Sequence, residues 1–580
     1  MITRMKKYTF LVLDSAYETF LTDLREAGVV HITQKAFGAA DDPVLSDALS
    51  RADELRRIIA QGAPDQLLNE RNEVQAKIAA TQKEVERMRI WGSFSAETLT
   101  AIRDAGYTLN YYSCPKKQFH EEWGIVAAED KANIYFVSVN GEVQNAQCRP
   151  ETLNAKSADD LQKDINALNG LLVAAEARIS AWQTTHLEAA KQELTEVQRT
   201  IDWQRVTLSA DTMAEGALHL LEGFCPAEQC ETLDAMLEQE GAYYEAEEPK
   251  AEDKTPIQLK NGFFARLFEP ITRLYSLPNY AELDPTPFLA PFFTLFFGLC
   301  LGDGGYGLLV MAAGLFLILK QPKLKEWGWM ALFMGVTTMV VGILTGMFFG
   351  IELEKVAFLA PIRQYFITQA NASVHVAGGT YHPLMVFAIL IGVFQILFAM
   401  GFKVVKVTLQ RGFKYALYDL AWLVGLIGLI VWVCVAGSLG TVGTYAFYAL
   451  FALCAALILF YGDPDRKFLV MNIGGGLWGT YNMVSGLLGD VLSYIRLFAL
   501  GLAGGILGSV FNSLALQVLG SMPAWIGWLP MLFIMVFGHG LNFGLCLISS
   551  VVHPLRLTFV EFYKNAGFEG GGQEYQPFKK

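Results

Sequence analysis

The sequence is short of charge, and the shortage is confined to one half of the chain. Charged residues make up 18% of the 580 residues and hydrophobic residues 53%. Residues 1–283 hold 29 Lys and Arg and 45 Asp and Glu, whereas residues 284–580 hold only 16 and 12. The long uncharged runs of the second half exclude a single soluble globule. We expect an acidic soluble half, which is unsuited to nucleic acid, followed by a membrane half.

Patterns for metal, nucleotide or covalent chemistry are also missing. The eight cysteines are scattered, without a CxxC pair or a metal-ligand spacing. Gly474-Gly475-Gly476 leads into Leu and Trp instead of the lysine of a phosphate-binding loop. No Ser/His/Asp constellation stands out, so we predict a non-catalytic chain with no cofactor and no bound metal.

The N-terminus does not have the pattern of a signal peptide. Its apolar run, residues 8–13, ends at Asp14 and is too short for the hydrophobic region of a signal. We predict a β-strand there and a cytoplasmic location for the soluble half. A second strand at 27–33, a helix between the two, and a strand–turn–helix–strand pattern at 217–245 predict a proximal α/β lobe. We assign it to residues 1–44 plus 206–250.

Two heptad-like segments lie between the parts of this lobe. The first covers residues 45–91 and is interrupted at Gly62 and Pro64. In the second, residues 157–205, apolar residues alternate steps of four and three. They are Leu161, Ile165, Leu168, Leu172, Ala175, Ile179 and Trp182, and after a one-residue slip Leu187, Ala190, Leu194, Val197 and Ile201. We predict an antiparallel coiled-coil hairpin that carries a distal α/β lobe, residues 92–156. A solvated helix pair that merely spaces two domains is the alternative.

The rest of the chain is predicted to be all-α and to cross the membrane eight times. Polar residues at 246–262 indicate a linker, and we place the boundary segment at 261–284, between an arm (1–260) and a transmembrane domain (285–580). The apolar spans are 287–301, 304–319, 327–350, 382–402, 418–438, 444–461, 480–515 and 524–556. The first two are short and joined by Gly302-Asp303-Gly304-Gly305, as in a tight turn. The last two exceed the roughly 20 residues of a perpendicular helix, so we expect them to be tilted.

The positive charges predict the orientation. The even number of spans and the positive-inside rule both place the N-terminal half and the C-terminus in the cytoplasm. The loop cations that then become cytoplasmic are Lys320, Lys323, Lys325, Lys403, Lys406, Arg411, Lys414, Arg466 and Lys467. Only Lys355 and Arg363 fall outside.

Between Phe468 and Tyr563 there are four charged residues: Asp490, Arg496, Arg556 and Glu561. Arg496 lies near the middle of an apolar helix, where insertion of arginine costs roughly 2.5–3.5 kcal/mol. Because arginine does not lose its proton, it forms a permanent cation there and is a candidate gate for an ion pathway. The alternative is a structural pair with Asp490, although six residues separate the two by about 120° around a helix.

The residues near Arg496 on the same face are small. Ser493 and several glycines and alanines of the helix allow another helix to approach closely in lipid. A moving partner helix and ordinary packing within one bundle both fit this pattern.

The last span carries a polar line of His539, Asn542, Cys546, Ser549 or Ser550, His553 and Arg556. Its 17 residues cover about 25 Å of helix, so we interpret it as a hydrated route for ions. Arg556 and Glu561 fit a cytoplasmic interface as well, and Glu561 fits it better. Asp303 fits either a structural turn or transport.

These segments resemble the membrane-embedded a-type subunit (subunit I in bacteria) of V-type and V/A-type rotary ATPases. The resemblance rests on DPTPFLAPFFTLFFGLCLGDGGYG from Asp284, on SYIRLFALGLAGG from Ser493, and on GHGLNFGLCLISSVVHPLRLTFVEFYKNAGFEGGGQEYQPF from Gly538. The soluble arm resembles the family's N-terminal domain in architecture only.

The resemblance implies a stator that faces a rotor ring of proteolipid c/K-type subunits. The family's channel arginine then falls on Arg496 and its second arginine on Arg556. Two offset half-channels would load and unload the ring carboxylates, with Asp490, Ser493, His539, Asn542, His553 and Glu561 as candidate linings. Further implied partners are peripheral stalk E/G-type subunits, central-stalk subunits and membrane lipid. The implied location is a bacterial or archaeal inner membrane, and the transported ion is either H⁺ or Na⁺.

Two positions depart from the family pattern. Where eukaryotic relatives carry carboxylates, this chain has Asn482 and Cys546, which puts the half-channel linings in doubt. An alternative function is a self-contained secondary transporter with a coiled-coil regulatory domain, but no repeat between halves supports it.

Overall fold

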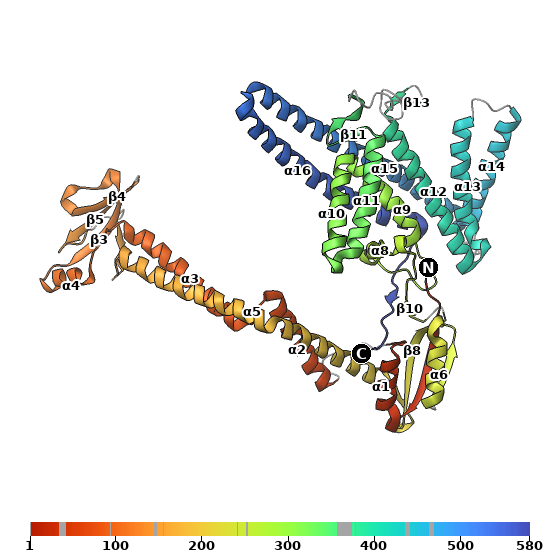
Figure 1. The fold of residues 1–580 in the computed structure, drawn as a ribbon, viewed down its shortest axis with the longest axis horizontal. Helices are drawn as coiled ribbons and strands as arrows, with labels where there is room; N and C mark the ends of the chain where they lie inside the picture. The colour runs from red at the N-terminus through yellow and green to blue at the C-terminus, as the bar shows by residue number, and fades with distance from the viewer. Residues whose placement is uncertain are drawn as a thin grey trace. The chain divides into compact units, whose positions relative to one another are not determined.

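The computed structural model of the chain is mostly helical and divides into two compact units (Figure 1). One unit contains Met1–Ile32 and Ala217–Lys579, and the other contains Thr33–Gly216. The structure describes residues 2–33, 42–92, 94–130, 132–143, 148–154, 156–240, 242–250, 253–355, 374–376, 379–435, 441–462 and 469–579. The loop cations Arg363, Arg466 and Lys467 lie outside these ranges.

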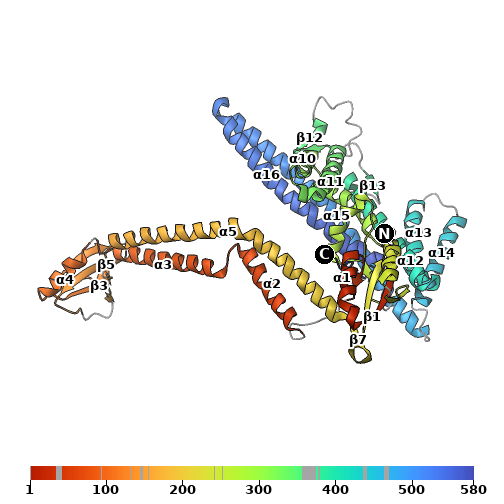
Figure 2. The same cartoon turned by 60° about the horizontal axis from the view of Figure 1, so that its bottom comes forward.

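In the unit Thr33–Gly216, two helices pack along a third (Figure 2). They are α2 (Pro43–Gln61) and α3 (Asp65–Arg89), which lie against the 52-residue α5 (Ala158–Ser209). Gly62, in the left-handed region with φ 77°, ends α2, and Pro64 precedes α3, as the sequence predicts. Every apolar residue predicted to face the partner helices from α5 is buried or half-buried. Periodicity therefore identified the packed face of this helix correctly. The strand β7 (Asp211–Met213) follows α5.

A small sheet lies between α3 and α5 in the sequence. Its antiparallel order is β4-β5-β3-β6, formed by β3 (Leu109–Pro115), β4 (Ile125–Glu129), β5 (Asn133–Val139) and β6 (Arg149–Glu151). Helix α4 (Ala96–Asp104) precedes it, capped by the Ser95 side chain. Tyr112, Cys114, Phe136 and Cys148 form its core.

The second sheet belongs to the other unit. Its strands are ordered β2-β8-β1-β9 and comprise β1 (Met5–Leu13), β2 (His31–Ile32), β8 (Leu218–Pro226) and β9 (Tyr243–Glu247). Helices α1 (Tyr17–Ala27) and α6 (Cys230–Glu240) follow β1 and β8. The pairing of β1 with β8 joins the N-terminal strand to the 217–245 segment, as predicted from the sequence.

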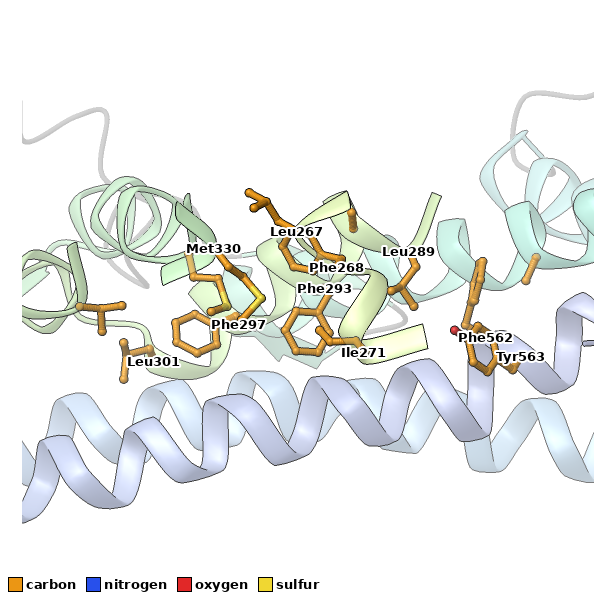
Figure 3. Packing of buried hydrophobic residues seen from close by; sticks show 14 of the residues in the cluster. Leu267, Phe268, Ile271, Leu289, Phe293, Phe297, Leu301, Met330, Phe562 and Tyr563 are labelled. Carbon is orange, nitrogen blue, oxygen red and sulfur yellow. The ribbon is translucent and has the colours of Figure 1, made fainter. Parts of the chain in front are cut away.

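Residues 261–284, predicted as a linker, contain two short helices instead. These are α7 (Phe263–Arg266) and α8 (Glu269–Tyr275). Leu267, Phe268 and Ile271 are buried against α9 and the C-terminal helices, in one apolar cluster (Figure 3). The prediction was wrong because polar residues at the start of this segment outweighed the helical spacing of its aromatic residues.

Among the residues that the structure describes, the apolar half contains six helices long enough to cross a membrane and two shorter apolar helices. In order they are α9 (Thr286–Leu301), α10 (Gly304–Lys320), α11 (Lys325–Leu344), α12 (Pro383–Arg411), α13 (Phe413–Val435), α14 (Thr441–Phe460), α15 (Leu469–Ser521) and α16 (Ala524–Arg556). A π-helix (Leu557–Phe562) and α17 (Tyr563–Ala566) continue α16. The chain is therefore a multi-pass membrane protein.

The helix ends differ from several predicted span boundaries. The span predicted to reach residue 350 ends at Leu344, because Gly346 and Gly350, with φ 73° and 67°, lead into a hairpin. This hairpin is β11 (Met347–Phe348) with β12 (Ile351–Glu352), and a second one pairs β13 (Val374–Val376) with β14 (Gly379–Tyr381). Helix α15 starts eleven residues before the predicted 480, so it is 53 residues long.

A buried ion pair fixes the C-terminal tail to the helical bundle. Lys406 of α12 and Glu282 are 5% and 3% exposed and lie 2.5 Å apart. Glu282 also accepts hydrogen bonds from the backbone N–H groups of Glu569 and Gly570, and Lys406 donates to the Gly567 carbonyl. Burial alone would raise the pKa of Glu282, but its hydrogen bonds to Lys406 and the backbone hold it below the usual value.

The tail then runs to the N-terminal sheet. β15 (Gln573–Glu574) pairs in parallel with β10 (Pro256–Ile257), and Phe578 donates its backbone N–H to the Val30 carbonyl. Tyr575 donates its hydroxyl to the Val29 carbonyl. The last residues of the chain thus connect the membrane helices to the first lobe.

We expect Lys406→Met to destabilise the purified subunit by roughly 3–5 kcal/mol, since it leaves Glu282 as an unpaired buried carboxylate. The double variant Lys406→Met/Glu282→Gln should lose less than the two single variants added together. Thermal unfolding in detergent measures both effects.

Lys403→Met on the same helix is the matched control. The side chains of Lys403 and its partner Asp419 are 36% and 15% exposed, so we expect a smaller loss. Equal losses for Lys403→Met and Lys406→Met would contradict the role of the buried pair.

Candidate functional site

Arg496 lies on an exposed face of α15. Its side chain is exposed, and exposed residues recur above and below it at steps of three and four. They are Ser485, Leu488, Leu492, Ala499, Ala503, Ile506 and Val510. The face therefore continues over about seven helical turns and carries a single charge. Ala499 and Ala503, next to Arg496 on this face, have small side chains that project little from the helix.

The glycines of α15 point the other way, into their own subunit. A Cβ on Gly501 would lie 2.4 Å from the Leu299 carbonyl oxygen, and one on Gly504 would lie 2.7 Å from Cys546 Sγ. These glycines let the α9–α10 turn and α16 approach closely. The small residues of α15 therefore lie on two opposite faces. The glycines serve ordinary packing within the subunit, whereas the alanines next to Arg496 remain exposed and leave room for a partner helix.

Asp490 does not pair with Arg496. Its carboxylate is 5% exposed and accepts hydrogen bonds from Lys564 Nζ at 3.0 and 3.1 Å and from Asn565 Nδ2 at 2.9 Å. Both partners belong to the segment after α16, 74 and 75 residues away in sequence. The alternative of a structural Asp490–Arg496 pair is therefore wrong, and Asp490 joins α15 to the C-terminal segment.

Ser493, His553 and Glu561 lie next to Asp490 and form, with it, an inner polar cluster. His553 is 6% exposed and donates from Nε2 to the Ser493 carbonyl at 3.3 Å. Glu561, on the π-helix, is 1% exposed and lies beside the Ser493 side chain. The place of Glu561 relative to the membrane interface stays a prediction, and its side chain is buried inside the subunit.

His539 and Asn542 belong to a second, outer polar cluster. Asn542 is 1% exposed and donates to the Tyr306 hydroxyl and to the Gly504 carbonyl, both at 2.9 Å. His539 lies 2.9 Å from the Tyr306 hydroxyl through Nδ1, and donates from Nε2 to Asn512 Oδ1 at 2.9 Å. The polar line of α16 therefore faces α10 and α15.

The two clusters lie at different depths, on either side of Arg496. Along α15, the inner cluster contacts Ser493 and the outer one contacts Gly504, eleven residues further on. At 1.5 Å per residue, that spacing is about 16 Å. Arg496 lies one turn above the inner cluster, with apolar residues between it and the outer one.

Arg556 ends α16 and is exposed. It continues the exposed residues of that helix, which include Leu545, Ile548 and Val552. His553 lies within electrostatic range of both Arg556 and Arg496. The two guanidinium groups therefore occupy neighbouring places on the outer faces of α15 and α16.

Asp303 is 1% exposed and caps the N-terminus of α10. Its carboxylate accepts from the backbone N–H groups of Gly305, Tyr306, Phe349 and Gly350 at 2.7–3.2 Å. These bonds join the α9–α10 turn to the β11–β12 hairpin. This geometry favours a structural role for Asp303 in the turn, which was one of the two roles that the sequence allowed.

Three cavities lie along α15. The outer one, about 560 Å³, extends from Glu352, Glu354 and His382 to Leu502 and Ile506 on the exposed face of α15. The other two lie toward the opposite end of α15. They measure about 730 and 370 Å³ and share the lining residues Lys403, Tyr418 and Asp419.

Several residues of these clusters could not be found from the sequence. They lie in separate segments without a shared motif, and they are Lys564, Asn565, Tyr306, Asn512, Glu352, Glu354 and His382.

Asn482, one of the two departures from the family pattern, lines the 370 Å³ cavity. Within the residues that the structure describes, no group of acidic, histidine or cysteine side chains could hold a metal ion.

This arrangement suits ion movement better than covalent chemistry. It offers buried polar groups at two depths, with a permanent cation on an open helix face between them.

Comparisons with known proteins agree with the resemblance. Residues 131–355 match the V-type ATPase 116kDa subunit family. The chain is 25% identical to the V-type ATP synthase subunit I of Borreliella burgdorferi, with all of both chains aligned. It is 30% identical to the A-type ATP synthase subunit I of Methanocaldococcus jannaschii, over 62% of this chain and 55% of the relative. The V-type ATP synthase subunit I 1 of Treponema pallidum is 24% identical over all of both chains.

We expect Asp303→Ala to destabilise the subunit by at least about 3 kcal/mol, because it leaves buried N–H groups without an acceptor. Asp303→Asn keeps one acceptor oxygen and should lose less. Thermal unfolding in detergent, with hydrogen exchange of residues 347–352, measures the change. An Asp303→Ala subunit that unfolds like the unmodified one and keeps its exchange protection would contradict the capping role.

Proposed function

We propose that this chain, which belongs to the subunit I family of V-type and A-type ATP synthases, is the membrane stator of its rotary complex. The observation that carries the proposal is the place of Arg496. It lies exposed on an apolar helix face, beside small residues, with a polar cluster on each side of its level. Such a cation needs an anionic or hydrated partner, and the partner comes from outside the subunit.

The partner that fits this face is a ring of small membrane subunits that carry buried carboxylates. Ala499 and Ala503 leave room for the approach of a helix, and Arg496 attracts a carboxylate that has lost its ion. As the ring turns, each carboxylate exchanges its ion with one cluster, passes Arg496 in the charged form, and exchanges again with the other cluster. The ATP-hydrolysing or ATP-forming site then lies in other subunits.

Two half-channels give the ions access to the ring. We assign to the outer half-channel the 560 Å³ cavity, which is lined by Glu352 and His382, together with the cluster of His539 and Asn542. The inner one comprises Asp490, Ser493, His553 and Glu561. Arg556 supplies a second cation beside Arg496, which strengthens the barrier between the two routes. Moving one charge through 100 mV releases about 2.3 kcal/mol, so a direct leak would waste the gradient.

The orientation and the arm complete the proposal. The turns with Lys320 and Lys325, and with Arg411 and Lys414, lie at one end of the helical bundle, and the β11–β12 hairpin lies at the other (Figure 1). The positive-inside rule makes the basic end cytoplasmic, together with the arm and the C-terminus. An antiparallel coiled coil of α2 and α3 with α5 would then transmit force to peripheral E/G-type stalks, while all eight apolar helices span an inner membrane.

We expect Arg496→Lys to lower ion transport coupled to ATP hydrolysis to less than about a tenth, with the complex still assembled, since lysine can lose its proton in a dry site. Proton or sodium uptake by inverted membrane vesicles measures transport, and subunit composition after purification measures assembly. Transport at the normal rate in an assembled Arg496→Lys complex would rule out the stator mechanism.

A second expectation concerns the exposed alanines. Ala499→Trp adds a large side chain at the proposed ring surface and should prevent association of the ring. Val433→Trp is the matched control, because Val433 on α13 is 66% exposed but lies on a different helix. Both variants place tryptophan in contact with lipid, so only a docking partner distinguishes them. Recovery of ring subunits on purification through this chain is the measurement; equal recovery with both variants would argue against a ring on this face.

A further inference from the structure

We propose that Glu561 is the proton-accepting carboxylate of the inner half-channel and that Asp490 connects it to water through the cavities near Lys564. This inference rests on the proposed function and names the side chains that deliver the ion. It also identifies the ion as a proton, because a chain of side chains passes protons but not sodium ions.

The first argument is the state of the Glu561 carboxyl group. It is 1% exposed, and within the described part of the chain its Oε2 atom has no hydrogen-bond partner. A carboxyl group that serves only the fold is satisfied by donors, because burying an unpaired carboxylate is costly. Asp303, with its backbone donors, is the example within this same subunit. Glu561 instead keeps one oxygen available for a proton.

The second argument is the surroundings of Glu561. From α15, Asp490, Ser493 and Tyr494 face it, and Arg556 lies within electrostatic range on its own side. The Tyr494 hydroxyl does not donate to Glu561, because its proton is used in a hydrogen bond to Gln395 Oε1 at 2.7 Å. The charges of Asp490 and Arg556 therefore act on the Glu561 carboxyl group in opposite directions.

The third argument is a polar path to the cytoplasmic end of the helices. The 730 Å³ cavity is lined by Lys406, Gln410 and Arg411, near the ends of α12 and α13. It shares lining residues with the 370 Å³ cavity, which reaches Lys564 and Asn565. These two side chains bind the Asp490 carboxylate directly, and Asn565 also donates to the Glu561 carbonyl at 2.7 Å.

The step itself is a simple proton transfer. A hydronium ion in the 370 Å³ cavity gives its proton, by way of Asp490, to the Glu561 carboxylate and becomes water. Neutral Glu561 then gives the proton to the carboxylate of the ring subunit that faces the Arg496 level. Glu561 returns to the charged form, and the transferred proton leaves with the ring.

The test uses the whole complex in inverted membrane vesicles, with ATP-driven acidification followed by a pH-sensitive dye in sodium-free buffer. We expect Glu561→Gln to lower the initial rate at least about tenfold with the complex intact. The residual rate should rise about tenfold for each unit of decrease in external pH, since it then depends on hydronium directly. Glu561→Asp keeps the acid and should retain part of the rate with a normal pH profile.

The matched control is Glu326→Gln, at the start of α11, where the side chain is 66% exposed. It should pump like the unmodified complex. A normal rate in Glu561→Gln would overturn the inference. The inference would also be overturned if Glu561→Gln lowered the acidification rate equally at every pH and the Glu561→Asp complex were inactive. These two results together indicate a structural role. If Glu561→Gln fails to assemble, the rate and pH profile of Glu561→Asp decide by the same criteria.

Arg496→Lys in the same vesicles separates this inference from the proposed function. If Arg496→Lys stops acidification and Glu561→Gln does not, the stator stands and the assignment of Glu561 is wrong. If Arg496→Lys acidifies normally, the proposed function itself is wrong. A rate that requires sodium in the unmodified complex would overturn the proton assignment alone.

Discussion

An arginine on the apolar face of a membrane helix must find an anion or water, and this requirement governs the membrane half of the chain. Arg496 remains charged at any physiological pH. Asp490, the acidic residue of its own helix, is already bonded to Lys564 and Asn565. The charge of Arg496 is therefore left for a partner outside the subunit, and the exposed alanines beside it leave room for that partner. The polar side chains of the two clusters are buried or half-buried and lie above or below its level.

The opposite face of α15 shows how such a helix is held in place. Gly501 and Gly504 allow the α9–α10 turn and α16 to contact the helix backbone, and Asp303 joins that turn to the β11–β12 hairpin. Close backbone contacts and charged caps hold an element rigidly. A surface that a rotor passes must keep its position under load. The glycine face therefore anchors α15, while the alanine face is the one available for contact with a moving partner.

Residue patterns predicted the parts of the structure that depend on short-range periodicity. The packed face of α5, the break at Gly62 and Pro64, and the pairing of β1 with β8 all follow from spacing within a segment. Arg496 was found because one charge in an apolar run is conspicuous. Contacts between distant segments were not predictable. Asp490 meets Lys564 across 74 residues, and Tyr306 meets His539 across 233. The contact of Glu561 with Ser493 was likewise not predictable, because the π-helix that carries Glu561 has no signal in the sequence.

In the stator that we propose, the vertical separation of the two polar clusters allows a single cation to control the pathway. If the inner and outer clusters met at one depth, water would connect them and Arg496 would have to block a continuous channel by charge alone. With about 16 Å between them, apolar side chains already interrupt the path inside the subunit. Arg496 then has only to act on ions that travel along the outer face of α15. In the proposed mechanism, the ring carboxylate passes Arg496 in the charged form, and it exchanges ions only with the cluster on either side of that level.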